Sequence, residues 1–434
     1  MHELAQPISV LPVRALRGEL AVPGDKSISH RSIMLGSLAR GTTRISNFLR
    51  GGDNFSTMAA FRAMGVPIED DGQTVTVHGV GLYGLKEPED VLDCGNSGTT
   101  IRLMTGLLSG QAFFSVLTGD QYLRKRPMKR VVEPLAGMGA RIAGRGDGTL
   151  APLAISGGPL TGISYSSPIA SAQVKSALML AGLYATDETR VTEPTLSRDH
   201  SERMFRFFGA DLETCHNGVV VRGGKELQGQ EIIVPGDISS ATFFIVAALI
   251  VPGSELLIKN VGVNPTRTGA LDILLAMGGD ITLLNQRDIS GEPVADLLVR
   301  SSRLKGIEIG GDVVPRAIDE FPAISIAASV AEGTTVIRDA RELRVKETDR
   351  IAAMATNLRA IGAGQIEETE DGMLIQGVAS LEGGSITSCG DHRIAMALAV
   401  AALVSRNQVQ IDDVSCVATS FPGFFELLDS VSVR

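Results

Sequence analysis

The chain has 434 residues, with a hydrophobic share of 44% and a charged share of 21%, as in a globular protein of two or three domains. Its net charge of −9 argues against a general nucleic-acid binder, which would carry a basic excess. A small anionic ligand needs only a local basic cluster, so that class stays open.

Nothing in the chain predicts a membrane, export or metal segment. The four cysteines are far apart and have no metal-ligand spacing, so we expect them to stay reduced. Residues 1–4 do not open a signal peptide, and the most apolar stretch, 241–251, is too short to span a bilayer. We therefore expect a cytoplasmic monomer that binds no nucleic acid, membrane or metal.

A βαβαββ pattern recurs along the chain. The second helix of each copy ends in an apolar residue followed by glycine, at intervals of roughly 70 to 85 residues. These endings are Met64-Gly65, Met138-Gly139, Phe208-Gly209, Met277-Gly278 and Ile361-Gly362. A sixth, shorter copy begins at Leu403 and ends in a helix over residues 424–428.

The copies predict an α/β (α+β) fold with two lobes. In the first copy, residues 59–64 have helical spacing and residues 74–78 alternate as a strand does. Six copies are too many for one core, so we expect three in each lobe. The first lobe is predicted to hold residues 22–236, and the second residues 1–21 together with 237–434. A generic α/β chain with similar turns is the alternative.

The first chemical motif spans residues 23–31. A Pro-Gly turn is followed by Asp25, which can cap a helix whose first turn carries Lys26 and Ser27. Free N–H groups there, with Lys26 and Arg31 beside them, suit a phosphate or a carboxylate. It is not a P-loop, because Asp25 precedes Lys26 where a P-loop has glycine. Taken alone, the motif is better explained as a capped surface helix.

Three further motifs follow in the first lobe. Residues 94–102 lead into an apolar helix through Gly98, which lets a ligand approach the backbone closely. Residues 124–130 carry five cations, and Arg126 at an expected helix start is a candidate anion clamp. Residues 171–177 open another apolar helix with small polar groups that can bind a hydroxyl or a phosphate.

The second lobe carries candidate acid and base groups. The paired carboxylates 319–320 precede an apolar helix, and a partly desolvated carboxylate there could act as a general base. Lys346, Glu347 and Arg350 fall on one face at helical spacing, which ordinary salt bridging also explains. Residues 389–395 open a further apolar helix with a histidine and an arginine, without the spacing of a metal site.

All of these motifs lie at expected helix starts, at equivalent places in different copies. Helix N-termini carry partial positive charge. If the copies stack with like ends aligned, both lobes direct helix N-termini and cations at one cleft. The ligands should then carry several negative charges.

In this order, and over nearly the whole chain, the motifs resemble those of the enolpyruvyl transferase family, in particular its branch that acts on shikimate 3-phosphate. The resemblance implies a two-lobed inside-out α/β barrel, with three βαβαββ units per lobe, that closes on its substrates at a hinge. It also implies transfer of the enolpyruvyl group of phosphoenolpyruvate to the 5-hydroxyl of shikimate 3-phosphate, with release of phosphate and without a cofactor.

The resemblance further implies roles for individual residues. The shikimate 3-phosphate ligands would be Lys26, Ser27, Arg31, Ser171, Ala172, Gln173, Arg198, Asp319 and Lys346. The phosphoenolpyruvate ligands would be Lys26, Gly98, Arg126, Gln173, Arg350 and Arg393, with Asn96 and Thr99 shaping the loop. Asp319 would accept the proton of the attacking hydroxyl, Glu347 would protonate the methylene carbon, and Lys26 would touch both substrates.

Three positions depart from the family pattern. Ala172 stands where many members have a second serine, and Thr419 where many have a lysine that binds phosphoenolpyruvate. Leu103 follows Arg102 where many have proline. These departures resemble a divergent, class II branch, some of whose members tolerate glyphosate. The response of this chain to glyphosate stays open.

Two alternative functions remain. One is the sister enzyme that acts on UDP-N-acetylglucosamine, which is disfavoured because residues 121–123 hold no cysteine in the loop before Arg126. The other is a non-catalytic anion-binding repeat protein, which would not need Asp319 or Glu347. Phosphate release that requires both shikimate 3-phosphate and phosphoenolpyruvate would distinguish enolpyruvyl transfer to shikimate 3-phosphate from these two alternatives.

Overall fold

The computed structural model describes residues 6–434 and has the α/β architecture that the sequence predicts. The described residues form two compact units. Unit 1 holds the described residues up to Pro23, Pro235–Asp288 and Pro293–Arg434, and unit 2 holds Gly24–Val234 and Ile289–Glu292. The sequence prediction placed its limits at residues 22 and 236 and did not include the short return to unit 2 at residues 289–292. Residues 1–4, which the signal-peptide prediction concerns, lie outside the described residues.

The described strands of unit 2 form three sheets with one common order. In each sheet two strands pair in parallel, and a following hairpin adds antiparallel to the second of them. A parallel pair needs a crossover, which a helix provides. The strands are β3 (Ala39–Ser46), β4 (Ile68–Asp70), β5 (Thr74–Val80), β14 (Leu227–Gln228) and β15 (Glu231–Ile233); β6 (Leu92–Asp93), β7 (Phe114–Thr118), β8 (Arg141–Arg145) and β9 (Leu150–Ser156); and β10 (Ser164–Ser166), β11 (Thr189–Thr192), β12 (Asp211–Cys215) and β13 (Gly218–Arg222).

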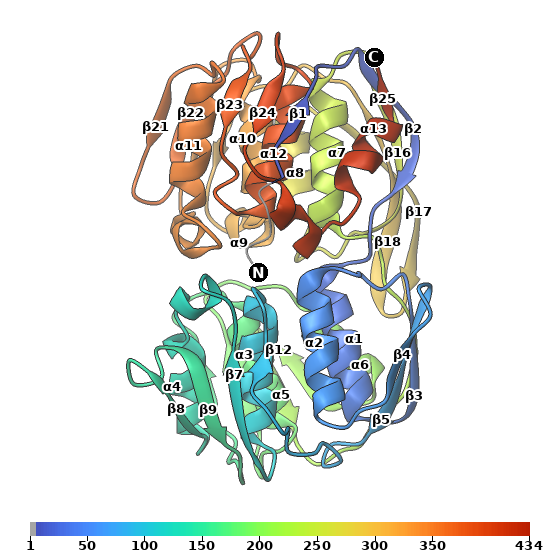
Figure 1. The fold of residues 1–434 in the computed structure, drawn as a ribbon, viewed down its shortest axis with the longest axis vertical. Coiled ribbons are helices and arrows are strands. Elements are labelled where there is room, and N and C mark those ends of the chain that lie inside the picture. Colours follow the sequence, from blue (N-terminus) through green and yellow to red (C-terminus); the bar gives the residue numbers. More distant parts are fainter. Residues whose placement is uncertain (1–5) are drawn as a thin grey trace. The chain divides into compact units, whose positions relative to one another are not determined.

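Three helices of unit 2 are buried on nearly all sides: α1 (Lys26–Leu38), α3 (Gly98–Ser109) and α5 (Ala172–Gly182). Most of their side chains are apolar or small, as in helices that fill a core. They lie inside the unit, with the sheets outside them (Figure 1). The other helices are α2 (Gly52–Ala63), α4 (Lys129–Gly137), α6 (His200–Phe207) and the short 3-10 helix η1 (Leu123–Lys125).

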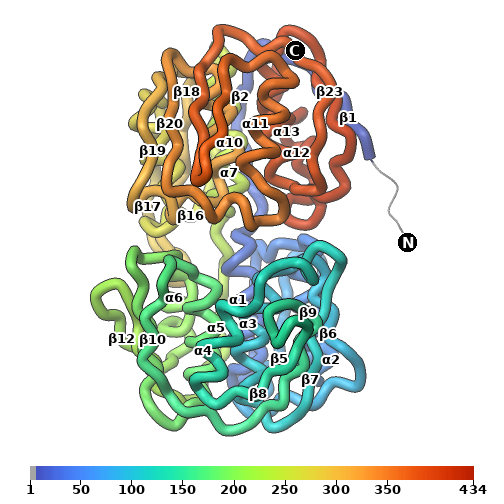
Figure 2. Tube along the Cα trace, turned by 90° about the vertical axis from the view of Figure 1, so that its left-hand side faces the viewer, coloured from blue at the N-terminus to red at the C-terminus, as the bar shows by residue number. Residues whose placement is uncertain are grey.

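The described part of unit 1 repeats this plan with three more sheets. Its strands are β2 (Ala15–Ala21), β16 (Glu255–Gly262), β17 (Asp280–Ile289), β18 (Glu292–Arg300) and β25 (Ser432–Val433); β19 (Glu308–Ile309), β20 (Thr334–Ile337), β21 (Ile366–Glu368) and β22 (Met373–Gln376); and β1 (Ile8–Val10), β23 (Gly384–Ile386) and β24 (Val409–Ile411). The sixth copy is short because β1, from the start of the chain, takes the place of its closing hairpin beside β24 (Figure 1). Figure 2 labels β1 and β23, the two outer strands of this sheet.

The helices of unit 1 are α7 (Ile238–Ile250), α8 (Gly269–Ala276), α9 (Val313–Ala317), α10 (Phe321–Ser329), α11 (Arg350–Ala360), α12 (His392–Ala402), α13 (Phe424–Ser430), η2 (Arg341–Val345) and η3 (Ser415–Thr419). Among them α7, α10 and α12 are wholly or almost wholly buried and match α1, α3 and α5 of unit 2. Each unit therefore has three core helices inside an outer layer of sheets.

The two units exchange their first strands. In unit 2 the parallel partners of β3 are β14 and β15, which come from the end of the unit rather than from the segment before α1. In unit 1, β2 precedes α1 in the chain but pairs in parallel with β16. The chain thus passes from one unit to the other between a first strand and a first helix.

The glycines that mark the copies cap their helices as predicted. Helices α2, α4, α6, α8 and α11 each end one residue before an apolar C-cap, and the glycine that follows has a positive φ. The φ values, from 81° to 95°, belong to the left-handed region that glycine adopts without a Cβ clash. The regular endings therefore predicted the repeat correctly.

Candidate active site

The first motif of unit 2 begins helix α1. The Asp25 carboxylate caps the helix by accepting the N–H of Ile28 at 2.8 Å. The Lys26 ammonium lies 2.5 Å from the Asp53 carboxylate in the first turn of α2, and the Lys26 side chain is 18% exposed. Asp53 thus fixes the orientation of an ammonium group that solvent, and therefore a ligand, can still reach.

The Arg31 guanidinium is buried one turn further along α1. It donates to the Ser201 hydroxyl at 2.7 Å, the Ser176 hydroxyl at 2.8 Å and the Ser27 carbonyl at 3.0 Å. Burial lowers the pKa of Arg31 to about 10, and the positive charge of Arg198 acts in the same direction. Arg31 therefore remains a cation at neutral pH, and the field of Arg198 acts on it.

The second motif places Gly98 at the first residue of α3, with Ser97 as the cap. A Cβ at Gly98 would lie 3.0 Å from an Arg126 nitrogen and 3.1 Å from an Arg102 nitrogen. Arg126 also donates to the Asn96 side chain at 2.5 Å. Glycine thus makes room for two guanidinium groups at the start of a helix.

Arg102 is a site candidate to which the sequence reasoning gave no role. Its guanidinium donates to the Gln173 side chain at 2.5 Å and to the Pro127 carbonyl at 3.2 Å. Gln173 in turn donates to the Thr99 hydroxyl at 3.1 Å. The available signal was a cation one turn into an otherwise uncharged helix, four residues after Gly98.

The third motif begins α5, where the Ser171 hydroxyl caps the helix by accepting the N–H of Val174. Ala172 is the first helical residue and is only partly buried, like its neighbours Ser171 and Gln173. Contacts of Arg102 and Arg31 tie this helix start to those of α3 and α1. The three core helices of unit 2 therefore gather their predicted ligands at linked N-termini.

A buried polar chain also joins the first three helices. The Nδ1 atom of His30 lies 2.7 Å from the Thr57 hydroxyl, which lies 2.7 Å from the Thr100 hydroxyl. Burial and the charges of Lys26 and Arg31 lower the pKa of His30 well below its ordinary value. The imidazole is therefore neutral at neutral pH and acts as a structural link between α1, α2 and α3.

The predicted cluster of unit 1 forms around Asp319, just before α10. Its carboxylate lies 3.3 Å from Arg350, 3.5 Å from Lys346 and 3.9 Å from Arg393. Arg393 also donates to the Asp319 carbonyl at 3.1 Å. The Asp319 side chain is 14% exposed, so a carboxylate surrounded by three cations remains reachable.

Arg350, the first residue of α11, is the centre of this cluster. It is 1% exposed and donates to Asp391 at 2.8 Å and to Glu347 at 2.6 Å. Burial alone would lower the pKa of Arg350, but the carboxylates of Asp391, Glu347 and Asp319 outweigh it and raise the pKa. The guanidinium is therefore permanently charged.

The expected helix across residues 346–350 is wrong, although Glu347 and Arg350 do meet. Lys346 and Glu347 lie in the loop that follows η2. The Asp349 side chain caps α11 by accepting the N–H of Ala352 at 3.0 Å, so the helix begins only at Arg350. A loop, rather than a helix face, presents Lys346 and Glu347.

A family model for EPSP synthase (3-phosphoshikimate 1-carboxyvinyltransferase) matches residues 10–428 of the chain. The chain belongs to the EPSP synthase family. It is 71% identical to the 3-phosphoshikimate 1-carboxyvinyltransferase of Geobacter sulfurreducens over 98% of this chain and 99% of that one. It is 69% identical to the enzyme of the same name from Pelobacter propionicus, over 97% and 98% of the two chains.

The fold agrees with that of a solved EPSP synthase. The structure of EPSP synthase from Acinetobacter baumannii matches with a TM-score of 0.88 and 50% identity, over 99% of both chains. The predicted α/β fold and enolpyruvyl transferase resemblance are confirmed, and neither alternative function finds support in the comparisons.

The paired carboxylates at 319–320 have separate places in this EPSP synthase fold. Glu320 is buried, accepts a hydrogen bond from the Ser239 hydroxyl and lies 3.6 Å from Arg267. Asp319 alone faces the cations of Lys346 and Arg393. Only one of the two carboxylates is therefore a candidate general base.

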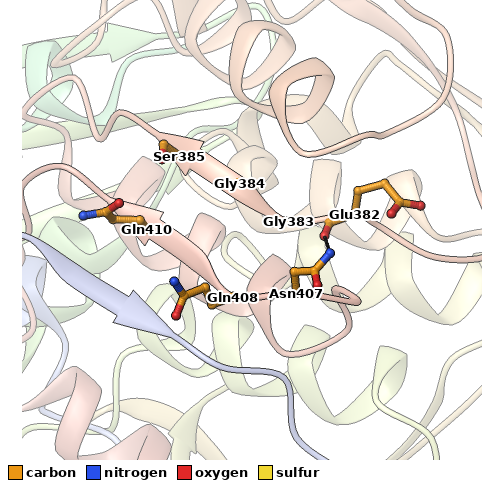
Figure 3. A pocket seen from close by; sticks show the side chains of 7 residues that line it. All are labelled: Glu382, Gly383, Gly384, Ser385, Asn407, Gln408 and Gln410. Atoms are coloured by element: carbon orange, nitrogen blue, oxygen red, sulfur yellow. Dashed lines mark hydrogen bonds between the residues drawn. The ribbon is translucent and has the colours of Figure 1, made fainter.

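A hollow of about 310 Å³ lies elsewhere in unit 1, at the ends of β23 and β24 (Figure 3). It is lined by Glu382, Gly383, Gly384, Ser385, Asn407, Gln408 and Gln410. None of these is a predicted ligand, and the lining has no cation. Among residues 6–434, no group of three potential metal ligands occurs and no helix is long and apolar enough to cross a membrane.

Proposed function

We propose that the chain transfers the enolpyruvyl group of phosphoenolpyruvate to the 5-hydroxyl of shikimate 3-phosphate and releases phosphate, using both of the clusters described above. The family match over residues 10–428 carries the assignment of the reaction. The step belongs to the shikimate pathway, which leads to chorismate and the aromatic amino acids.

The unit 2 cluster supplies anion binding. Lys26, Ser27, Arg31, Ser171, Ala172, Gln173 and Arg198 bind shikimate 3-phosphate in this proposal, and Lys26, Gly98, Arg126 and Gln173 bind phosphoenolpyruvate. Their support is the linked starts of α1, α3 and α5, where helix dipoles and cations favour negative charge. Arg102 joins them as a positioning residue, because it holds the Gln173 side chain.

The unit 1 cluster supplies the proton transfers. Asp319 accepts the proton of the 5-hydroxyl, while Arg350 and Arg393 bind phosphoenolpyruvate and Lys346 binds shikimate 3-phosphate. Glu347, held 2.6 Å from Arg350, delivers a proton to the methylene carbon of phosphoenolpyruvate. A positioned acid or base of this kind contributes about 10²- to 10⁴-fold to the rate.

The reaction then balances without a redox partner. The 5-oxygen bonds to C2 of phosphoenolpyruvate as C3 gains a proton, which gives a tetrahedral intermediate. Loss of a proton from C3 and cleavage of the bond between C2 and the phosphate ester oxygen restore the double bond and expel phosphate. Overall, the hydroxyl proton ends on the released phosphate. Fixed cations stabilise the negative charge that both substrates bring together.

The test is a phosphate-release assay with the full chain. We expect release only when shikimate 3-phosphate and phosphoenolpyruvate are both present, and none when UDP-N-acetylglucosamine replaces shikimate 3-phosphate. Equal release with the nucleotide sugar would contradict the proposed acceptor. We also propose that the chain is a cytoplasmic monomer, which predicts a solution mass near 45.7 kDa by light scattering.

A further inference from the structure

A buried ionic cluster lies behind the phosphate-binding segments of unit 2. The Lys175 ammonium, 0% exposed, contacts Glu193 at 2.9 Å and Glu202 at 2.8 Å, and the two carboxylates are 0% and 3% exposed. Lys175 also donates to the Ser197 carbonyl at 3.4 Å. One ammonium group thus connects α5, the loop before α6, and α6 itself.

Glu193 extends this cluster to two proposed ligand segments. Its carboxylate accepts the backbone N–H of Ser171 at 2.7 Å, at the start of α5. It also accepts the Ser197 N–H at 3.2 Å and the Ser197 hydroxyl at 2.7 and 2.8 Å. Ser197 directly precedes Arg198, so a single carboxylate holds the backbone at Ser171 and at the residue next to Arg198.

Glu202 extends the cluster to Arg31. It neighbours Ser201 in α6, whose hydroxyl accepts from Arg31 at 2.7 Å and lies 2.6 Å from the Ser176 hydroxyl. Burial lowers the pKa of Lys175, but the charges of Glu202 and Glu193 outweigh it and raise the pKa, so the ammonium stays charged. Ser171 thus contacts the cluster directly, through Glu193. Arg198 and Arg31 are each linked to a cluster carboxylate through one serine, Ser197 and Ser201 respectively.

Stability alone does not explain three buried ionisable groups. Removing such groups from water costs free energy that their mutual attraction often fails to recover, and apolar replacements of similar volume are often no less stable. A buried ionic cluster does, however, impose one geometry on the segments that it joins.

We propose that Lys175, through Glu193 and Glu202, is a positioning residue that holds the Ser171, Arg198 and Arg31 segments in register for the phosphate of shikimate 3-phosphate. The inference rests on the proposed function, because it takes these three residues as phosphate ligands. The Lys175 side chain has no exposed surface, so it acts only through the segments that it holds. Because those segments carry proposed shikimate 3-phosphate ligands, loss of Lys175 should weaken the binding of shikimate 3-phosphate and not that of phosphoenolpyruvate.

The test compares steady-state kinetics of the wild type with the double variant K175M/E202Q. This variant removes one positive and one negative charge, so the net charge of the cluster is unchanged, and it leaves Glu193 in place. We expect the KM for shikimate 3-phosphate to rise about ten- to a hundredfold, as misplacement of binding groups by about 1 Å can cause. The KM for phosphoenolpyruvate should stay within about twofold of the wild-type value. Gln173, the proposed phosphoenolpyruvate ligand nearest to Lys175 in the chain, has its side chain held by Arg102 and Thr99 rather than by the cluster.

Met179→Ala is the matched control, because Met179 is fully buried in the same helix one turn beyond Lys175. It should lower thermal stability through a cavity and leave both KM values unchanged.

Unchanged KM values in a folded K175M/E202Q, or an equal rise in both, would overturn the proposal. If the double variant does not fold, E202Q alone decides by calorimetric titration with shikimate 3-phosphate: weaker binding than wild type supports the proposal and equal binding overturns it. Wild-type turnover, measured alongside, tests the proposed function separately.

Discussion

Helices α1 and α7 follow the same three residues, Pro-Gly-Asp, but differ in the side chains of their first turns. Pro23-Gly24-Asp25 and Pro235-Gly236-Asp237 each lead into a core helix, and the aspartate caps it in both cases. After the cap, α1 presents Lys26, whereas α7 continues with the buried Ile238. A capped helix start is thus common to both units, and the side chains of its first turn decide whether it can bind an anion.

The polar groups at the start of α7 are used internally. Arg267 lies 3.4 Å from Asp237 and donates to the Ser239 hydroxyl at 2.6 Å. Ser239 donates to Glu320. This network supports the turn that carries Asp319. Unit 1 thus has a structural network at its first helix start, whereas unit 2 has the proposed ligand Lys26 at the equivalent position.

The largest expected effect separates the two helix starts directly. Lys26→Ala should lower kcat/KM for both substrates by on the order of 10³-fold, because it removes a cation that stabilises negative charge in the transition state. Ile238→Ala, at the equivalent position of α7, should lower the free energy of unfolding by about 2–5 kcal/mol and leave both KM values unchanged. Phosphate-release kinetics and urea unfolding of both variants check this. A normal kcat/KM in folded Lys26→Ala would contradict a role in substrate binding for the start of α1.

The two adjacent carboxylates provide the next comparison. Asp319→Asn should reduce kcat about 10²- to 10⁴-fold, because the attacking hydroxyl loses its base. Glu320→Gln should instead destabilise the fold by about 1–3 kcal/mol, because Arg267 and Ser239 lose an ionised partner. The measurements are single-turnover phosphate release and urea unfolding. A similar loss of kcat in both variants would show that their roles are not separate.

A smaller effect is expected at Gly98, where the helix start meets two arginines. A methyl group there would press on Arg126 and Arg102 from 3.0 and 3.1 Å, so both guanidiniums must shift by a few tenths of an ångström. Gly98→Ala should raise the KM for phosphoenolpyruvate about tenfold and spare the KM for shikimate 3-phosphate. Steady-state kinetics with each substrate varied in turn measure the two KM values. A rise confined to the KM for shikimate 3-phosphate would contradict the placement of Gly98 among the phosphoenolpyruvate ligands.

The smallest effect concerns pH and the buried link of α1. The pKa of His30 is lowered in the folded chain, so the unfolded state binds its proton first as the pH falls. The contribution of His30 to stability is therefore complete above about pH 6.5 and is lost as the pH falls below that value, at about 1.4 kcal/mol per unit of pKa difference.

His30→Asn should remove this part of the pH dependence and keep a hydrogen bond to Thr57. Urea unfolding of both proteins at pH 7.5, 6.5 and 5.5 measures the pH dependence of the free energy of unfolding. Helix α7 has no histidine and so makes no comparable contribution to this pH dependence. Identical pH dependence in wild type and variant would rule out His30 as its source.

The sequence predicted most of the fold because the repeat has local signals. Glycines after the C-caps of α2, α4, α6, α8 and α11 need a positive φ, and that requirement is visible in the sequence itself. The aspartate and serine caps of α1, α3 and α5 are equally local. The exchange of β2 and β15 between the units is not local, since strands far apart in sequence carry no mark of their partners.

The candidate site was predictable only where motif and family resemblance agree. Arg102 and Lys175 lie in helices whose other residues are uncharged. The sequence alone does not distinguish a buried cation that binds a side chain from one that binds a ligand. Their partners, Gln173 for Arg102 and Glu193 for Lys175, come from other elements. The same limit produced the wrong helix at residues 346–350, because Glu347 and Arg350 meet at helical spacing without a helix between them.

Proton NMR of the reaction mixture tests the central claim most directly. With the full chain, shikimate 3-phosphate and phosphoenolpyruvate, the vinyl signals of phosphoenolpyruvate should be replaced by those of a new enol ether on the 5-oxygen, as an equal amount of phosphate appears. Vinyl signals that persist, or phosphate that forms without the enol ether, would contradict enolpyruvyl transfer by this chain.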